Sequence, residues 1–238
     1  MISIFSTRRK NYQLKVDKFS CNKFGISEFL VSTVDNNGSY SNLKVLDVGC
    51  GVGPLGIYFA DQRNCIVTGI EISTIACSCC AENISTLGLL SNFKLVNVDF
   101  CSYCEHNLAD DFDLIVSNPP IDDNVSLDEI RKYQNLSRIN IQNSRTFSYV
   151  TNSWHASSGR DLVDYIFLYG GNLLTNNGRI IIAFCELSCP DLSKIKKRGG
   201  LYGFSLIDVK KKKIPPQRVG AKRNGLISVV CMVFKRDI

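Results

Sequence analysis

The stretch SNPPIDD, Ser117–Asp123, places an amide side chain and two prolines directly after an apolar run, FDLIV. A side-chain carbonyl and a neighbouring backbone carbonyl can each accept one N–H of an amino group, which orients the nitrogen lone pair toward an electrophile. Asn118 supplies the first acceptor and the carbonyl of Pro119 the second. Because Pro119 and Pro120 fix φ and end the strand, these carbonyls stay turned into the site. The alternative is an ordinary proline-rich turn.

A glycine turn, DVGCGVGPLG, occupies Asp47–Gly56. Gly49, Gly51 and Gly53 permit positive φ, so a ligand can lie against the backbone and the N-terminus of the helix that follows. Glu71 comes eighteen positions after Gly53. Doubly wound folds place an acid at this distance to hydrogen-bond ribose hydroxyls, so the pair predicts a nucleoside site.

Polar residues also end the third and fourth apolar runs of the chain. Asp99 ends the third and is followed by Phe100, which puts a polar acceptor beside an apolar contact. The carboxyl ends of neighbouring parallel strands line one crevice, so side chains at these ends should meet. The alternative is that each residue only terminates its own strand. The residues expected to converge are Asp47, Glu71, Asp99 and Asn118.

The elements that must position these residues follow an alternating pattern from about residue 43 onward. Strands are expected at Leu43–Gly49, Cys65–Ile72, Phe93–Asp99, Phe112–Asn118, Gly178–Glu186, Tyr202–Val209 and Gly225–Lys235. Helices are expected over Pro54–Gln62, Ser73–Gly88 and Gly159–Gly178. This order predicts an α/β fold, a Rossmann-like doubly wound sheet of seven strands, mostly parallel with an antiparallel C-terminal hairpin.

The length of 238 residues and the 45% hydrophobic content suit one core rather than two. We expect residues 1–42 to form an N-terminal extension that packs on or near the active-site face, and residues 43–238 to form the catalytic domain. An insertion at about 122–157 is expected to face the substrate, with amphipathic surface helices as the alternative. Its candidate contact residues are Arg131, Tyr133, Arg138 and Arg145.

The net charge of +6 is concentrated near the C-terminus, in Lys194–Gly200 and Lys210–Gly225. Clustered lysines and arginines gain affinity for nucleic acids by displacing counterions from phosphates. The two basic segments are therefore either solvated loops or a contact surface for an anionic partner such as RNA.

The 11 cysteines are scattered through apolar segments and their number is odd, which favours buried reduced thiols over disulfides. Cys101 and Cys104 have C-x-x-C spacing, but no second pair follows, so we predict no metal site. No apolar run is long enough to span a membrane, and charge appears too early for a signal peptide. These features predict a cytoplasmic protein.

The motifs VLDVGCGVGPLGIYFA, GIEIS, NVDF and DLIVSNPPI, in this order, resemble those of class I S-adenosylmethionine-dependent methyltransferases. They are most similar to the N-P-P branch, which methylates amino or amide nitrogen and includes the small-domain and release-factor glutamine methyltransferases. The resemblance extends over Leu43–Phe234. It implies S-adenosyl-L-methionine as the cofactor and transfer of its methyl group to nitrogen.

By this resemblance Asp47 and the glycine turn would hold the methionine portion of the cofactor, Glu71 the ribose, and Asp99 with Phe100 the adenine. The complete set of cofactor-binding residues that we expect is Asp47, Gly49, Cys50, Gly51, Gly53, Glu71, Ile72, Asp99, Phe100 and Asn118. The catalytic residues would be Asn118, Pro119, Pro120 and Ile121.

The acceptor is left open by the sequence. An RNA base amino group is favoured by the basic segments, whereas a glutamine of a translation factor is favoured by Ile121, where many N-P-P enzymes have an aromatic residue. Trp154–Asp161, with Gly159, also partly resembles release-factor glutamine methyltransferases. Further alternatives are a small-molecule acceptor and a methyltransferase-like subunit that supports a partner subunit.

Overall fold

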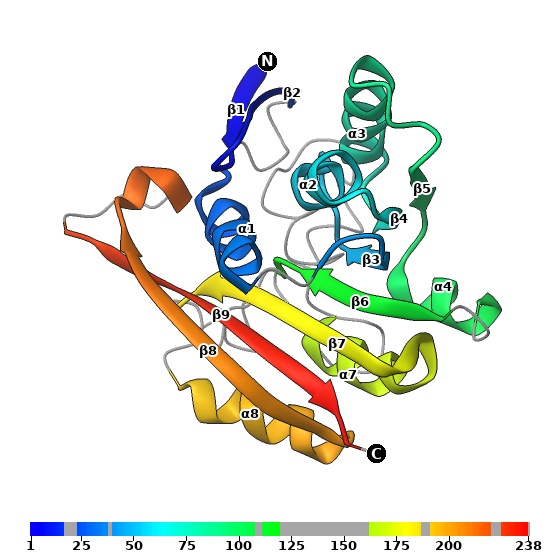
Figure 1. Ribbon diagram of the computed structural model, residues 1–238, viewed down its shortest axis with the longest axis vertical. Coiled ribbons are helices and arrows are strands. Elements are labelled where there is room, and N and C mark those ends of the chain that lie inside the picture. Colours follow the sequence, from blue (N-terminus) through cyan, green and yellow to red (C-terminus); the bar gives the residue numbers. More distant parts are fainter. Residues whose placement is uncertain are drawn as a thin grey trace, which may run out of the picture.

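The computed structural model describes residues 1–16, 23–37, 40–107, 111–119, 162–186, 191–219 and 225–237. Its main sheet has seven strands in the order β5-β4-β3-β6-β7-β9-β8 (Figure 1). Buried side chains form one core with α1, α2 and α3 on one face of this sheet and a second core with α4, α7 and α8 on the other. The predicted doubly wound α/β fold is confirmed.

The parallel half of the sheet comprises β3 (Lys44–Val48), β4 (Ile66–Glu71), β5 (Phe93–Asn97) and β6 (Phe112–Ser117). Because helices cover both faces, these strands read as nearly continuous apolar runs. From β3 the chain adds β4 and β5 on one side and later β6 on the other. The order therefore reverses between β3 and β6, and ligands of open α/β sheets bind at such a point.

The antiparallel half comprises β7 (Leu174–Cys185), β8 (Phe204–Ile214) and β9 (Ile227–Arg236). β7 begins earlier than expected, at Leu174, and its register with β6 shifts between Phe112 and Leu114. The prediction that Lys210 begins a loop was wrong, because β8 continues to Ile214 against the long strand β9. An edge strand accommodates these lysines because their side chains are exposed.

The helices around the sheet are α2 (Pro54–Arg63), α3 (Thr74–Thr86), α4 (Phe100–His106), α7 (Leu162–Leu173) and α8 (Leu192–Leu201), with a short 3₁₀ helix, η1 (Pro216–Val219). Ser73, the first residue of the helix expected at Ser73–Gly88, caps α3 by accepting a hydrogen bond from the Ala76 amide at 3.3 Å. The basic segment Lys194–Gly200 lies in α8, so the alternative of a solvated loop is wrong for this segment.

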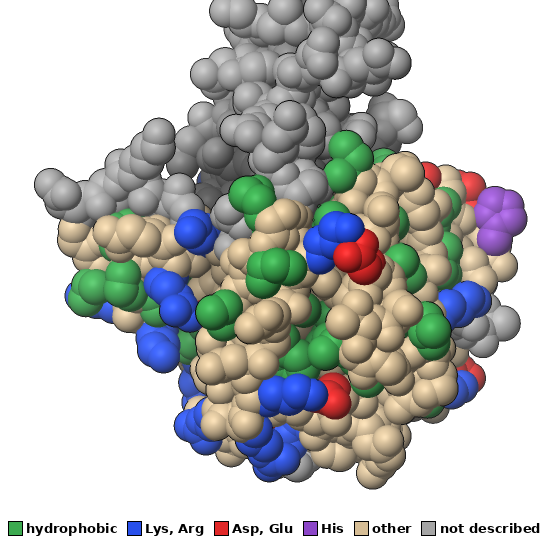
Figure 2. Space-filling model, turned by 90° about the horizontal axis from the view of Figure 1, so that it is seen from above, with side chains coloured by type: hydrophobic (Ala, Val, Ile, Leu, Met, Phe, Trp, Pro, Cys, Tyr) green, Lys and Arg blue, Asp and Glu red, His purple; other side chains and the backbone are tan. Residues whose placement is uncertain are grey.

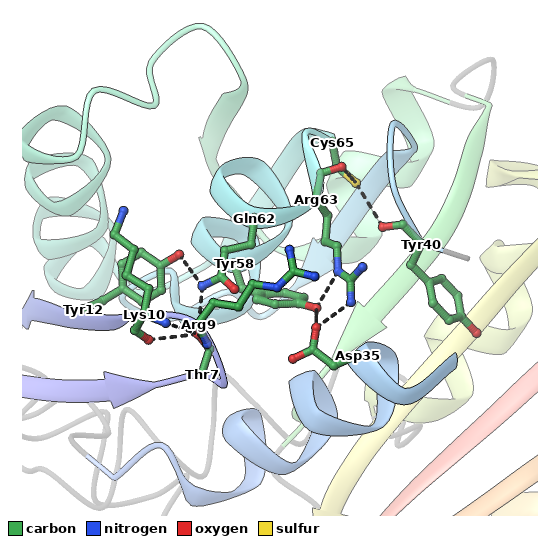
Figure 3. A network of polar contacts seen from close by, with 10 residues as sticks. All are labelled: Thr7, Arg9, Lys10, Tyr12, Asp35, Tyr40, Tyr58, Gln62, Arg63 and Cys65. Carbon is green, nitrogen blue, oxygen red and sulfur yellow. Dashed lines mark hydrogen bonds and ion pairs between the residues drawn. The ribbon is translucent and has the colours of Figure 1, made fainter. Parts of the chain in front are cut away.

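The N-terminal extension contains elements that the sequence analysis did not assign: β1 (Ile2–Ser6), β2 (Asn11–Lys15) and α1 (Gly25–Asn37). β1 and β2 pair as a separate antiparallel hairpin. Figure 3 shows the hairpin beside α2, where the Tyr12 hydroxyl accepts a hydrogen bond from the Gln62 side chain at 2.8 Å. The same hydroxyl donates to Asp61 of α2 at 2.6 Å. Lys10 adds an ion pair to Asp61 at 2.8 Å.

A second polar cluster in Figure 3 joins α1 to α2. The Tyr58 hydroxyl donates to Asp35 at 2.6 Å and accepts from Nε of Arg63 at 2.7 Å. Arg63 and Asp35 also form an ion pair whose side chains are only 8% and 6% exposed. Breaking such a buried pair leaves an uncompensated charge, so this ion pair holds α1 firmly against α2.

The nine cysteines in the described part of the chain are free thiols, and seven of them are buried. The prediction of reduced cysteines is confirmed for these positions. None of the helices in the described ranges has the length and apolar character needed to cross a membrane.

Candidate active site

The glycine turn joins the end of β3 to α2 and is fixed to the neighbouring strand. The amides of Gly49 and Cys50 both donate to the carbonyl of Ile70, at 2.9 and 3.0 Å. Gly51 has a φ of 58°, and a β-carbon added there would meet no atom of the described residues within 4 Å. The backbone at Gly51 therefore faces open space, as a turn that binds a ligand closely requires.

Gly53 has a different requirement, because a β-carbon at this position would lie 2.8 Å from the Cys80 sulfur of α3. Its φ of 94° is also in the left-handed region. Gly53 precedes the first residue of α2, Pro54, and provides no side-chain cap. The turn is thus pressed against α3 on one side, and the N-terminus of α2 lacks a capping side chain.

Glu71 ends β4 beside this turn. Its Oε2 accepts the Gly51 amide at 2.9 Å and its Oε1 accepts the Ser73 amide at 2.8 Å. Burial raises the pKa of Glu71, and the hydrogen bonds from these two backbone amides lower it in part. Each carboxylate oxygen has a second lone pair, so Glu71 can still accept hydrogen bonds from two hydroxyl groups. Ile72, the next residue, is 38% exposed.

Asp47 lies beneath the turn and is only 1% exposed. Burial is the main reason why its pKa rises to about 7, with a further contribution from the charge of Glu71. A hydrogen bond from the Gly56 amide to its Oδ2, at 2.9 Å, opposes this shift. Gly56 belongs to the first turn of α2, so the helix dipole favours the ionised carboxylate there.

Asp99 caps α4, two residues beyond the end of β5. Its Oδ1 accepts the Ser102 amide at 3.0 Å, and its Oδ2 accepts the Ser102 hydroxyl. Partial burial alone would raise the pKa of Asp99, but these hydrogen bonds outweigh it and lower the pKa. Phe100 is 5% exposed and meets Tyr169 edge-on, with ring centroids 6.2 Å apart. Asp99 is thus an ionised acceptor, and Phe100 packs in the core.

Asn118 follows β6, and its Nδ2 donates to the Ser27 hydroxyl of α1 at 3.4 Å. Ser27 is buried, with 3% exposure. In this arrangement the amide nitrogen of Asn118 points at α1, which leaves its carbonyl oxygen for another donor. The Ser117 hydroxyl donates to the Val48 carbonyl at 2.8 Å and ties the end of β6 to the end of β3. Pro119, the next residue, is buried.

Several predicted residues lie outside the described residues. They are Pro120 and Ile121, the insertion at about 122–157 with its arginines and Tyr133, and the segment Trp154–Asp161.

The strand order brings the predicted residues to one edge of the sheet. Asp99, Glu71, the glycine turn and Asn118 follow β5, β4, β3 and β6, which are adjacent strands. Neighbouring strands are about 4.8 Å apart, so Glu71 and Asn118 are separated laterally by roughly 10 Å. A nucleoside held at Glu71 would therefore have room to extend past the turn to Asn118.

Two asparagines that the sequence analysis missed support this edge. Asn83 of α3, 4% exposed, donates to the Val52 carbonyl of the turn at 3.0 Å and to the Lys15 carbonyl at 3.1 Å. Asn97 of β5 donates to the carbonyl of Glu71 at 2.8 Å. Asn83 follows buried Cys79 and Cys80 at helical spacing, which was a usable signal. Asn97 gave no signal, because its role depends on the pairing of β5 with β4.

The family model of the methyltransferase small domain matches residues 15–135, about half of the chain. The chain belongs to this methyltransferase family. Among curated relatives, a tRNA1(Val) (adenine(37)-N6)-methyltransferase of Bacteroides fragilis is 28% identical over 182 residues, covering 75% of this chain and 68% of the relative. A release factor glutamine methyltransferase of Lactococcus lactis is 31% identical over 128 residues, covering 53% and 44%.

The fold has close structural neighbours among methyltransferases as well. The crystal structure of M. jannaschii TYW2 in complex with AdoMet aligns with a TM-score of 0.56 at 18% identity, covering 100% of this chain and 87% of that one. This likeness concerns the fold. By its family and its relatives the protein is an S-adenosylmethionine-dependent methyltransferase, as the resemblance implied.

The residues at the edge of the sheet fit this cofactor chemically. Open space lies over the backbone of Gly51, and the carboxylate of Glu71 has acceptor capacity for two hydroxyls. The first turn of α2 lacks a side-chain cap, which suits a carboxylate group at its N-terminus. These are the groups needed for the glycine-turn and ribose contacts that the sequence predicted.

Proposed function

We propose that this protein transfers a methyl group from S-adenosylmethionine to the exocyclic amino nitrogen of an RNA base. The observation that carries the proposal is the position of Asn118. It follows β6, directly across the switch point from the glycine turn, with its amide nitrogen directed at Ser27. Its carbonyl oxygen is then the acceptor that an amino group entering from the other side would meet.

Asn118 would act on the acceptor nitrogen by hydrogen bonding. An exocyclic amino group is a poor nucleophile because its lone pair is delocalised into the ring. Acceptance of one N–H by the Asn118 carbonyl and of the other by the Pro119 carbonyl would orient the lone pair and stabilise the positive charge that develops. Once the nitrogen is alkylated its proton is acidic, so no general base is required. Pro120 and Ile121 remain predicted members of this site.

The cofactor, when bound, supplies an electrophilic methyl group on a sulfonium. We assign its ribose to Glu71 and its methionine portion to the turn containing Gly49, Cys50, Gly51 and Gly53, with Asp47 holding that turn from beneath. We assign the adenine to the edge formed by Ile72, Asp99 and Phe100. The backbone amides of Gly51 and Ser73 donate hydrogen bonds to Glu71 and fix its carboxylate before any ligand arrives. These hydrogen bonds support the assignment of the ribose to Glu71.

The relatives favour a nucleic-acid acceptor over a protein one. The Bacteroides fragilis relative, named for adenine N6 methylation of a tRNA, aligns over 75% of this chain, against 53% for the glutamine methyltransferase. Both named reactions methylate a planar nitrogen, which Asn118 could orient in the same way. A glutamine amide of a translation factor is therefore the second candidate, and Ile121 in place of an aromatic residue is the feature that favours it.

The N-terminal extension would form part of the acceptor side of the site. Ser27 of α1 contacts Asn118, and this contact supports our proposal that residues 1–42 pack at the active-site face. The insertion at about 122–157 would complete that side.

Transfer of labelled methyl from S-adenosylmethionine tests the proposal. Wild-type protein and an Asn118→Ala variant are incubated with unfractionated tRNA, with total ribosomal RNA and with a lysate depleted of RNA. Label in RNA that requires Asn118 supports the proposal. Label in protein alone would favour the glutamine reaction, and label in neither would favour a small-molecule acceptor or a need for a partner subunit.

A further inference from the structure

The second half of β8 carries four consecutive lysines, Lys210–Lys213, which we call the lysine ribbon. All four are exposed. β8 is the edge strand of the sheet and pairs with β9 alone among the described strands. Successive side chains of a strand point to opposite faces, so the ribbon presents positive charge on both faces of this edge.

The charge of the ribbon is only partly neutralised within the described residues. Lys210 lies 3.3 Å from Asp208, and Lys211 lies 2.5 Å from Glu186. No ion pair to Lys212 or Lys213 is formed by the parts of the chain that the structure describes. Two carboxylates against four lysines leave two positive charges for an external anion. The existing pairs are half-exposed, so they contribute little and can open at small cost.

The register of the sheet places the ribbon on the same edge as the candidate active site. Lys212 is opposite Val229 of β9, and Val229 is opposite Cys185, the last residue of β7. The ribbon is therefore level with the carboxyl end of β7, which runs parallel to β6 and Asn118. Three strand spacings separate β8 from β6, or about 14 Å, which corresponds to roughly four stacked nucleotides at about 3.4 Å each.

The first turns of α1 connect the two places physically. Ser27 contacts Asn118, and its neighbour Glu28 forms an ion pair with Arg218 of η1, which follows the ribbon. A β-carbon on Gly25 would lie 2.6 Å from the Arg218 carbonyl, so α1 and η1 are in close contact. The distance between the ribbon and Asn118 is thus fixed by one helix.

Lysines on an edge strand can also serve only to prevent edge-to-edge pairing of sheets. That purpose would call for charge along the whole strand. The first half of β8 instead exposes Ile207 and Val209, which are 49% and 37% accessible. The lysines occupy only the half nearest the candidate active site, so edge protection does not explain their distribution.

We propose that the lysine ribbon binds the backbone phosphates of the RNA acceptor about four nucleotides from the base that is methylated. This inference rests on the proposed function and adds to it the surface that holds the substrate. Phosphate contacts of this kind fix the register of a nucleic acid without reading its sequence. Figure 2 shows Lys and Arg side chains along its left margin, and in Figure 1 the end of β8 next to η1 lies on the same side.

The test compares a Lys212→Gln/Lys213→Gln variant with a Lys44→Gln/Lys94→Gln control. The control lysines are also exposed and lie on strands of the same sheet, but at its opposite, amino edge. Binding of unfractionated tRNA is measured by fluorescence anisotropy between about 50 and 200 mM salt, a range over which affinity that depends on phosphate contacts falls steeply. Methyl transfer to the same tRNA and binding of S-adenosylmethionine are measured in parallel.

The ribbon variant should lose about two units from the slope of log K against log salt, or about one per lysine. Its KM for tRNA should rise at least tenfold, while kcat and cofactor affinity stay within about twofold; the control should match wild type. An unchanged slope would overturn the inference. A ribbon variant that aggregates but binds RNA as tightly as wild type would also overturn it. If wild type labels RNA and the slope is unchanged, the ribbon proposal alone fails. If wild type transfers no label to RNA, the proposed function and the ribbon proposal both fail.

Discussion

The cofactor side and the acceptor side of the candidate site differ in how far they are built by short-range hydrogen bonds. On the cofactor side, Glu71 accepts two backbone amides, Asp47 accepts a third, and Asn83 and Asn97 hold the backbone around them. On the acceptor side, the described residues give Asn118 a single hydrogen bond, to Ser27 at 3.4 Å.

This difference indicates that the two sides work in different ways. A rigid cofactor side is preorganised for a ligand that is the same in every turnover. Within the described residues the Asn118 side chain makes only this one hydrogen bond, and we propose that its carbonyl oxygen accepts another when the acceptor enters. Substitutions on the cofactor side should therefore affect affinity, and substitutions on the acceptor side should affect rate.

The largest effect is expected from Asn118→Ala. Removal of an acceptor that stabilises the transition state should lower kcat about 10²- to 10³-fold, because this interaction is stronger there than in the ground state. Cofactor affinity should change no more than several-fold. Single-turnover kinetics and calorimetric titration with S-adenosylmethionine separate the two quantities.

The matched control for this variant is Asn107→Ala. Asn107 donates to the Tyr103 carbonyl at the end of α4, away from the carboxyl edge of the sheet. Equal turnover in the Asn118 variant and this control would remove Asn118 from the mechanism.

Glu71→Ala tests the opposite half of the comparison. Loss of hydrogen bonds to an ionised group should weaken the affinity for S-adenosylmethionine about 10- to 100-fold, with kcat at saturation within a few-fold. Glu82→Ala is the control, since Glu82 lies on the exposed face of α3. Titrations in which both variants bind as tightly as wild type would exclude the ribose role of Glu71.

Asp47 gives the cofactor side a pH dependence. Its pKa rises from 3.8 to about 7 on folding, so its contribution favours the folded state below about pH 4 and is lost as the pH rises to about 7. In the ligand-free protein, Asp47→Asn should remove this part of the decline in Tm over that range. Thermal melts of wild type and variant between pH 4 and pH 7.5 measure it. Parallel curves of Tm against pH for wild type and variant would mean that burial does not raise the pKa of Asp47.

The smallest effect is expected from Ser27→Ala. Ser27 is a positioning residue, so losing its hydroxyl should lower kcat by about two- to tenfold through the orientation of Asn118, with KM for S-adenosylmethionine unchanged. Ser27→Thr, which keeps the hydroxyl, should restore most of the rate. Ser32→Ala on the same helix is the control, because Ser32 bonds only to the Phe29 carbonyl in the described structure. A loss of rate that Thr does not restore would indicate a packing defect instead.

The parts of the fold that the sequence predicted are those specified by local patterns. Buried parallel strands, the proline at the start of α2 and the Ser73 cap all follow from residue order within a few positions. The same holds for the positions of Glu71 and Asn118, because strand ends and parallel topology together determine which residues meet. The elements and the places of Glu71 and Asn118 at strand ends were confirmed, whereas the roles of these two residues stay predictions.

The parts that it missed depend on contacts between distant segments. Ser27 matters because α1 packs against β7 and β9, which brings Ser27 to Asn118, 91 positions away in the sequence. Asn83 matters because the turn and the end of β2 both lie against α3. Lysines 210–213 resembled a loop because the strand pairing with β9, and not their own propensity, extends β8.

The chemical identity of the methylated atom decides whether Asn118 orients an amino group for methylation. After incubation with labelled S-adenosylmethionine, acceptor RNA and protein are digested completely, and the labelled product is identified by mass spectrometry. We predict a methyl group on an exocyclic amino nitrogen of a base, formed by wild type and not by Asn118→Ala. A methyl group on a carbon atom or on a ribose hydroxyl would contradict it, because neither atom carries the two N–H groups that Asn118 and Pro119 are proposed to accept.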